Sequence, residues 1–315
     1  MISSGKITLM LIGTLYCKAM DVCGKGKTVV MKTIIDSRSR VNNIFKPWFQ
    51  RMRYRSQEKR IIFIFGCQRS GTTLLTHVFD RMPYSCVFGE YSPLSSKDPY
   101  QLRLNHLDEV KAIIDSSPAP LIVCKPLVES QRALEILEYF DNAQAIWLYR
   151  DYMDVASSNL VKFGPDEGAR ENIRPVCDSE FANSASKNWL ADNVSIESQK
   201  MIEQCYHPSM NPADAAALFW YLRNEHYFTQ QLDSHPRVHL LKYEQLVSQP
   251  SESLARLFEL IDIPFSLPQN IIKDVHTESV RKGKTLELSP DVSVLANKML
   301  DRLLGMSQET NKIAS

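Results

Sequence analysis

The sequence predicts an α/β fold of three layers, in which a central, mostly parallel sheet carries helices on both faces. Two observations support this prediction: short apolar runs suited to strands buried on both sides, and longer segments of helical periodicity that alternate with them. A helix between two strands returns the chain to the edge of the sheet where the first strand began. The strands therefore pair in parallel.

The elements follow one another in a regular order along the chain. We expect a helix that begins at Thr72 and another that follows Tyr149, because apolar residues recur there at helical spacing. The expected strands are residues 61–65, 121–124, 145–149 and 238–242, with a short one between 82 and 90. Further helical segments cover residues 99–117, 130–140, 180–205, 212–233, 250–261 and 289–304.

Composition and charge argue against several classes of protein. The 315 residues are 44% hydrophobic and 23% charged, which is ordinary for a globular chain. A formal net charge of +1 argues against a nucleic-acid partner and against a role at a membrane surface. The seven cysteines show no C-x-x-C spacing, so we expect free thiols in a reducing compartment and no metal site.

The first 60 residues form an N-terminal leader whose structure the sequence does not define, whereas residues 61–315 are expected to form a single domain without an internal linker. The apolar run at residues 7–17 is too short to span a bilayer as a plain helix. We therefore expect a cytoplasmic protein without firm membrane association. An N-terminal anchor or signal stays open as the alternative, and a homodimer is compatible with the sequence.

The stretch from Ile61 to Leu75 organises the chain. An apolar strand leads into a turn bounded by Gly66 and Gly71, and a helix opens at Thr72. Backbone N–H groups of such a turn, together with the positive end of the helix dipole, converge on a phosphate-like group. The sequence therefore predicts a P-loop-type fold with an anion-binding loop at this point.

The loop departs from the nucleotide-binding P-loop at one decisive position. Thr72 stands where the G-x-x-x-x-G-K motif requires lysine, and Arg69 lies inside the loop instead. A P-loop kinase or NTPase also needs an aspartate for Mg²⁺ at a strand end, whereas two expected strands end in Lys125 and Arg150. A phosphotransferase and a non-catalytic nucleotide-binding module remain the alternative interpretations.

Other polar residues follow the expected strands where they end. Glu90 follows the short strand after the loop and could return to the same cleft, where a general base is needed. Lys125 would be costly to bury at a strand end without an anion. Arg150 at a strand end and Ser158 two helical turns later could hold a second phosphate.

The sequence from Arg69 to Leu75, R-S-G-T-T-L-L, resembles the 5′-phosphosulfate loop of sulfotransferases that use 3′-phosphoadenosine 5′-phosphosulfate (PAPS). Within that superfamily the chain is similar to the tyrosylprotein sulfotransferases and to the bacterial enzymes related to them. The resemblance implies a PAPS-dependent transfer of a sulfuryl group to an acceptor hydroxyl, with PAPS as co-substrate and no metal. The acceptor could be a peptide, a carbohydrate, a lipid or a small molecule, and the sequence does not choose among them.

The resemblance also implies a role for each residue of the site. Glu90 would be the catalytic base, and Arg69 and Lys125 would stabilise the charge that grows on the bridging oxygen. The residues implied to bind PAPS are Arg69, Ser70, Gly71, Thr72 and Thr73 at its 5′ end, Arg150, Ser158 and Lys162 at its 3′-phosphate, Tyr243 at the adenine, and Ser279, Arg281, Lys282 and Gly283 in a closing loop.

Overall fold

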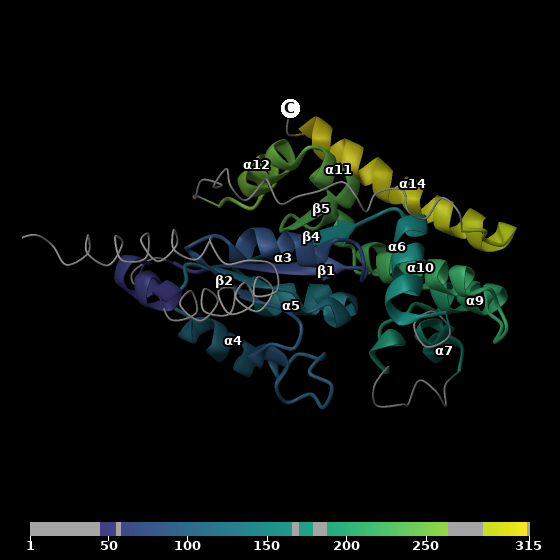
Figure 1. The fold of residues 1–315 in the computed structure, drawn as a ribbon, viewed down its shortest axis with the longest axis horizontal. Helices are drawn as coiled ribbons and strands as arrows, with labels where there is room; N and C mark the ends of the chain where they lie inside the picture. The colour runs from purple at the N-terminus through teal and green to yellow at the C-terminus, as the bar shows by residue number, and fades with distance from the viewer. Residues whose placement is uncertain (1–44, 55–57, 166–169, 179–187, 264–285, 314–315) are drawn as a thin grey trace, which may run out of the picture. The chain divides into compact units, whose positions relative to one another are not determined.

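The computed structural model describes residues 45–54, 58–165, 170–178, 188–263 and 286–313 (Figure 1). The chain divides into two compact units, Met1–Arg53 and Tyr54–Ser315. In the first unit the described residues belong to a helix that begins at Phe45. The second unit contains every described residue of the expected site.

A sheet of five parallel strands forms the centre of the second unit, as far as the structure describes the chain. Its order is β2-β3-β1-β4-β5, so β1 lies in the middle. The strands are β1 (Arg60–Gly66), β2 (Ser85–Phe88), β3 (Leu121–Cys124), β4 (Ala143–Tyr149) and β5 (Val238–Lys242). All four pairings are parallel. The predicted α/β class with a parallel sheet is confirmed.

Helices cover both faces of the sheet, and β1 shows why. Its side chains alternate in direction, as in any strand. Ile62 and Ile64 pack into one apolar cluster, which holds α3 (Thr72–Asp80), α11 (Tyr243–Ser248) and α12 (Pro250–Leu260). Phe63 and Phe65 pack into the other, larger cluster, which includes α4 (Leu107–Ser116), α5 (Ala133–Tyr139), α6 (Tyr152–Phe163) and α10 (Pro212–Thr229). Figure 1 shows α3, α11 and α12 on one side of the strands and α4 and α5 on the other.

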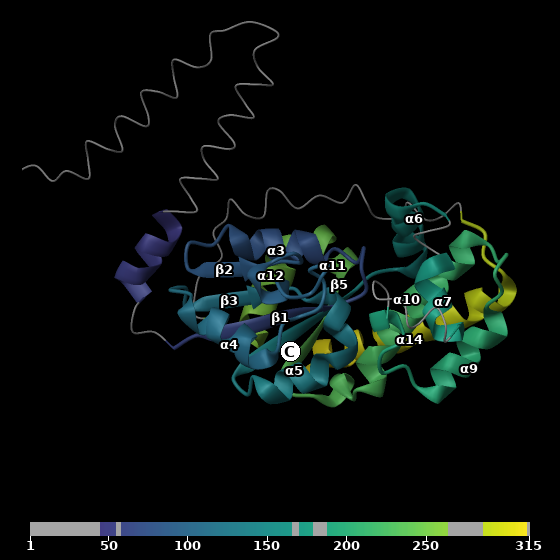
Figure 2. The same ribbon diagram turned by 90° about the horizontal axis from the view of Figure 1, so that it is seen from below.

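The helices take the following bounds. They are α3 (Thr72–Asp80), α4 (Leu107–Ser116), α5 (Ala133–Tyr139), α6 (Tyr152–Phe163), α7 (Glu171–Cys177), α9 (Ile196–Cys205), α10 (Pro212–Thr229), α11 (Tyr243–Ser248), α12 (Pro250–Leu260) and α14 (Pro290–Ile313). Short 3₁₀ helices are η1 (Pro93–Ser95), η2 (Leu127–Arg132), η4 (Asn188–Leu190) and η5 (Leu232–Ser234). In Figure 2, α6, α7 and α9 lie beyond one end of the strands, and α14 runs from that end back toward β5.

Some expected helices differ in their bounds. The segment expected as one helix over residues 130–140 is split, because η2 ends at Arg132 before α5 begins. The segment expected over residues 99–117 is helical only as α4, and the last helix extends beyond its expected end to Ile313. The apolar periodicity of the sequence predicted where these helices lie but not where they end, because capping and tertiary contacts determine the ends of a helix.

Two further observations concern expectations drawn from composition. The cysteines that the structure describes, Cys67, Cys86, Cys124, Cys177 and Cys205, are all free thiols. Across the described ranges, none of the helices combines the length and the apolar character that crossing a bilayer would require.

The turn after β1 depends on Gly66. Its backbone has a φ of 129°, which side-chain-bearing residues rarely adopt, and a Cβ there would lie 2.3 Å from the carbonyl oxygen of Leu148. Ser130 of η2 holds the same residue from the other side. Its Oγ accepts from the Gly66 N–H at 3.1 Å and lies 3.2 Å from the Gly66 carbonyl oxygen. Gly66 is thus fixed between a neighbouring strand and η2.

We predict that Gly66→Ala lowers the free energy of unfolding by about 3 kcal/mol, because the new Cβ requires a strained backbone and displaces β4. Chemical denaturation measures the change. Gly305→Ala is the matched control, since nothing lies within 4 Å of a Cβ at this α14 position. It should stabilise the protein by about 0.5–1 kcal/mol, as alanine does for glycine in a helix. Equal effects of the two substitutions would contradict this account of the turn.

Candidate active site

The loop between β1 and α3 presents polar groups at the start of a helix. Arg69 adopts the left-handed backbone conformation, with a φ of 68°, and Gly71 follows with a φ of 93°. Ser70 is fully buried, and its Oγ has no hydrogen-bond partner among the described residues. Thr72 and Thr73 open α3 without an acidic residue in its first turn. Orphan donors and a positive helix end favour an anion here.

Glu90 and Lys125 meet beside this loop. Their strands are neighbours in register, because Phe88 of β2 pairs with Cys124 of β3. The two residues therefore leave the sheet at the same edge, where Lys125 Nζ lies 3.0 Å from Glu90 Oε2. The ammonium also donates to Thr73 Oγ1 at 3.3 Å. The lysine is 7% exposed, so a buried ammonium joins the Glu90 carboxylate to the loop.

Arg69, Arg150 and Ser158 form a second group on the other side of the loop. Arg69 Nε donates to Ser158 Oγ at 3.0 Å, and Arg150 Nη1 donates to the Arg69 carbonyl oxygen at 3.4 Å. The structure therefore brings together the residues implied at the 5′ and 3′ ends of the co-substrate. Arg69, however, makes no hydrogen bond to Glu90 or Lys125 in the described residues, so its contacts join it to the second group.

Tyr243 lies between the loop and Arg150. The guanidinium carbon of Arg150 is 4.5 Å from the centroid of the Tyr243 ring. A Cβ at Gly71 would lie 2.2 Å from Cδ2 of the same ring. Gly71 is thus required for two reasons, its positive φ and the close approach of the aromatic ring. The role implied for Tyr243 at the adenine stays a prediction.

Two of the expected binding residues stand apart. Lys162 is exposed near the end of α6 and makes no hydrogen bond or ion pair with the described residues. The closing loop with Ser279, Arg281, Lys282 and Gly283 lies outside the described residues. The roles implied for these positions stay predictions.

The sequence analysis missed several residues that support the site. Asp154 of α6 pairs with Arg150, with Oδ2 3.3 Å from Nη2. The spacing of four residues was a signal for this pair, because such residues are neighbours on a helix. Trp220 Nε1 donates to the Arg150 carbonyl oxygen at 2.9 Å, and Glu244 Oε1 accepts from the Asp151 N–H at 3.0 Å. These two contacts join distant segments and left no local signal.

The titratable groups limit the chemistry that the site can perform. Burial raises the pKa of the Cys67 thiol to about 12, with the charge of Arg223 opposing the change. Burial likewise raises the pKa of Cys124. Neither thiol is ionised at neutral pH, so a thiolate nucleophile is excluded at these positions. Within the described ranges, no group of three or more His, Cys, Asp or Glu side chains could hold a metal ion.

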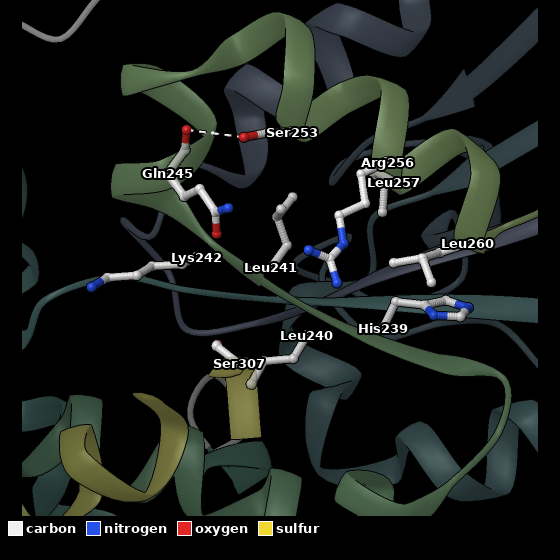
Figure 3. A pocket seen from close by; sticks show the side chains of 10 residues that line it. All are labelled: His239, Leu240, Leu241, Lys242, Gln245, Ser253, Arg256, Leu257, Leu260 and Ser307. Atoms are coloured by element: carbon white, nitrogen blue, oxygen red, sulfur yellow. Dashed lines mark hydrogen bonds between the residues drawn. The ribbon is translucent and has the colours of Figure 1, made fainter. Parts of the chain in front are cut away.

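A small cavity lies away from this loop (Figure 3). It is bordered by β5, α11, α12 and Ser307 of α14, and its volume is about 40 Å³. Gln245 and Ser253 face one another across one side, where Ser253 Oγ donates to the Gln245 carbonyl oxygen at 3.0 Å. The cavity has room for on the order of three water molecules. None of the expected site residues that the structure describes lines it.

Comparison with known proteins identifies similar chains. The family model of the sulfotransferase domain matches residues 59–302. The sulfotransferase domain of the Synechococcus PCC 7002 olefin synthase is 17% identical, and the likeness covers 78% of this chain and 95% of that one with a TM-score of 0.47. No curated protein matches the chain.

Two more solved structures are similar at lower identity. A sulfotransferase from Alicyclobacillus acidocaldarius is 12% identical, over 78% of this chain and 94% of that one, with a TM-score of 0.48. Mouse sulfotransferase SULT7A1 complexed with PAP is also 12% identical, over 80% of this chain and 89% of that one, with a TM-score of 0.41.

The environment of Glu244 predicts a pH-dependent stability. Burial raises the pKa of this carboxyl above its ordinary value of 4.5, with backbone hydrogen bonds opposing the change, and Oε2 is buried without a partner in the described residues. Its favourable contribution is therefore present below pH 4.5 and is lost as the pH rises through the folded-state pKa.

We predict that Glu244→Gln stabilises the protein at pH 7 and that the gain disappears below pH 4.5, since the amide can accept from the Asp151 N–H without carrying a buried charge. Denaturation as a function of pH measures the difference between the two proteins. Glu259→Gln on the exposed side of α12 is the control and should show no such trend. A gain for Glu244→Gln that is largest at low pH would refute the assignment.

Proposed function

The chain belongs to the sulfotransferase domain family, in agreement with the resemblance carried by its loop, and we propose that Glu90, Lys125 and the loop at 66–73 transfer the sulfuryl group of PAPS to an acceptor hydroxyl. The observation that carries the proposal is the three-way contact of Glu90, Lys125 and Thr73 at the strand edge where the loop opens. It combines a base and a cation at the start of the anion-binding helix.

The loop residues fit the 5′ end of PAPS. Ser70 offers a buried hydroxyl that no described group engages, and the first N–H groups of α3 are available as donors. Gly71 keeps side-chain atoms away from the position where the backbone and the Tyr243 ring approach one another. When bound, PAPS supplies an activated sulfuryl group on a phosphate leaving group. Ser70 to Thr73 would hold that phosphate by hydrogen bonds.

Arg150, Ser158 and Tyr243 fit the nucleoside end. Arg150 is a forked donor that lies over an aromatic ring, and Ser158 adds a hydroxyl on the same side of the loop. Through its carbonyl oxygen and its Nε, Arg69 contacts both of them. We propose that Arg69 orients the nucleoside end of PAPS through these contacts. From this position its guanidinium would extend toward the sulfuryl group.

Glu90 and Lys125 have different roles in sulfuryl transfer. Glu90 accepts the proton of the acceptor hydroxyl, which makes the oxygen a better nucleophile. Lys125 stabilises negative charge that grows on the oxygen of the leaving phosphate, and its contact with Thr73 places it next to the loop. Sulfuryl transfer resembles phosphoryl transfer in that alignment and charge neutralisation contribute more than covalent catalysis.

A P-loop kinase or NTPase fits these residues less well. Such an enzyme needs a lysine at the position of Thr72 and a free carboxylate at a strand end for Mg²⁺. Asp151 follows β4, but its side chain accepts from the N–H groups of Met153 and Asp154 as the N-cap of α6. A non-catalytic nucleotide-binding module would leave the pair of Glu90 and Lys125 without a purpose.

We predict that Glu90→Gln lowers kcat for sulfuryl transfer by about 10²–10⁴-fold, because the amide cannot accept the hydroxyl proton. Transfer from radiolabelled PAPS to a hydroxyl acceptor identified by screening measures the rate. The affinity for 3′-phosphoadenosine 5′-phosphate (PAP), measured by calorimetry, should change little.

Glu109→Gln is the matched control. Glu109 of α4 also pairs with a lysine, Lys97 in the turn after η1, but this pair is exposed. This variant should keep the full rate. Near-normal turnover in Glu90→Gln would remove Glu90 from the role of base, and an equal loss in both variants would mean that the effect is structural.

A further inference from the structure

Arg223 is a fully buried arginine that the reaction described above does not use. It lies on α10 and faces η2, where Nη1 donates to Gln131 Oε1 at 3.0 Å and Nη2 donates to the Leu127 carbonyl oxygen at 2.6 Å. Its guanidinium carbon is 5.1 Å from the centroid of the Trp189 ring. Burial lowers the pKa of Arg223 to about 10, so the side chain stays charged at neutral pH.

This charge has no carboxylate partner among the described residues. The carboxylate of Glu129 influences the charge of Arg223, but the oxygens of Glu129 are already engaged by other groups. Oε1 accepts from Arg103 Nε and from the Leu104 N–H, and Oε2 accepts from Arg132 Nη1. Burying a charge without an opposite charge lowers the stability of a protein. We therefore looked for a functional role of Arg223.

Neutral groups surround the guanidinium. Its two acceptors, Gln131 Oε1 and the Leu127 carbonyl oxygen, carry no formal charge. Three nitrogen donors, Arg223 Nε, Gln131 Nε2 and Trp189 Nε1, are buried without a hydrogen-bond partner in the described part of the chain. Arg223 is therefore held by neutral acceptors and not by an ion pair.

Short connections join Arg223 to the anion-binding loop. Leu127 and Gln131 belong to η2, and η2 also carries Ser130, which hydrogen-bonds to Gly66 at the end of β1. The next residue, Cys67, is fully buried in the same apolar cluster as Trp189. Its thiol pKa, raised by burial, is lowered in turn by the charge of Arg223. The charge thus acts on the first residue of the loop.

Two cations at the front of the site are already balanced. Lys125 pairs with Glu90, and Arg150 pairs with Asp154. A polyanionic co-substrate must then be neutralised mainly by groups without such partners. Arg69 of the loop and Arg223 both lack a carboxylate partner among the described residues, and the field of Arg223 is little screened because its side chain is fully buried.

From this arrangement we propose that Arg223 is an electrostatic binding residue: it does not touch the co-substrate, but its unpaired charge behind the loop favours the binding of a nucleotide with several phosphate groups. The inference rests on the proposed function, since it assumes that the loop at 66–73 holds the 5′ end of PAPS. It predicts that removing the charge of residue 223 weakens ligand binding, and that the loss of affinity is larger for a ligand that carries more negative charge.

Gln131→Glu tests the inference without removing Arg223. The new carboxylate keeps the shape of the side chain and can accept from Nη1, but it neutralises the guanidinium. We expect PAP to bind the full-length variant about tenfold more weakly. Adenosine 5′-monophosphate should lose less, and adenosine should bind as it does to the unsubstituted protein. Calorimetry with these three ligands measures the series.

Arg223→Met and Arg223→Lys complete the set. The methionine variant should show the same graded loss, and lysine should restore most of the PAP affinity. Gln144→Glu adds the same charge near the opposite end of β4 and serves as the control for net charge. If Arg223→Met fails to fold, the PAP affinity of Gln131→Glu alone tests the inference, because this substitution preserves the packing.

The outcomes distinguish the inference about Arg223 from the proposed function of the chain. Unchanged PAP affinity in Gln131→Glu would overturn the inference while leaving the proposed function intact. An equal loss for PAP and adenosine would assign Arg223 a structural role only and would also overturn it. If the unsubstituted protein does not bind PAP, the proposed function itself fails.

Discussion

The parallel register of β2, β3, β1 and β4 is the constraint on which the site depends. Parallel strands end at one edge, and this edge gathers polar residues from distant parts of the chain. Phe88 pairs with Cys124, so Glu90 and Lys125 leave the sheet side by side. Gly66 pairs with Leu148, so the anion-binding loop emerges next to the strand that leads to Arg150. A shift in either register would separate the Glu90 carboxylate from the Lys125 ammonium, or the loop from Arg150.

Charge at this edge is held in place before any ligand binds. Lys125 and Arg150 are both largely buried and both contact carboxylates, and hydrogen bonds tie them to the loop through Thr73 and the Arg69 carbonyl oxygen. Preorganised cations of this kind need no rearrangement when negative charge develops, which is why they are effective in transfer reactions.

Much of the fold and the centre of the site could be predicted from the sequence, because their signals are local. The loop was recognisable from the order of strand, glycines and helix, and Glu90 and Lys125 from their positions after apolar runs. The contacts of Ser130 with Gly66 and of Arg223 with Gln131 join segments that are far apart in the chain, so no local sequence pattern predicts them. Sequence alone also could not show that Arg69 would bridge Arg150 and Ser158, since side-chain direction depends on packing.

The most direct test of the account is thermal and chemical unfolding of the protein with PAP, with ADP and with Mg·ATP. If the loop, Arg150 and Ser158 hold a nucleotide phosphorylated at both ends, PAP at about 100 times its Kd should add roughly 2.7 kcal/mol to the free energy of unfolding. This stabilisation should not require Mg²⁺, and ADP should give much less at the same concentration. Stabilisation by Mg·ATP without an effect of PAP would contradict the assignment of the site and favour a phosphotransferase.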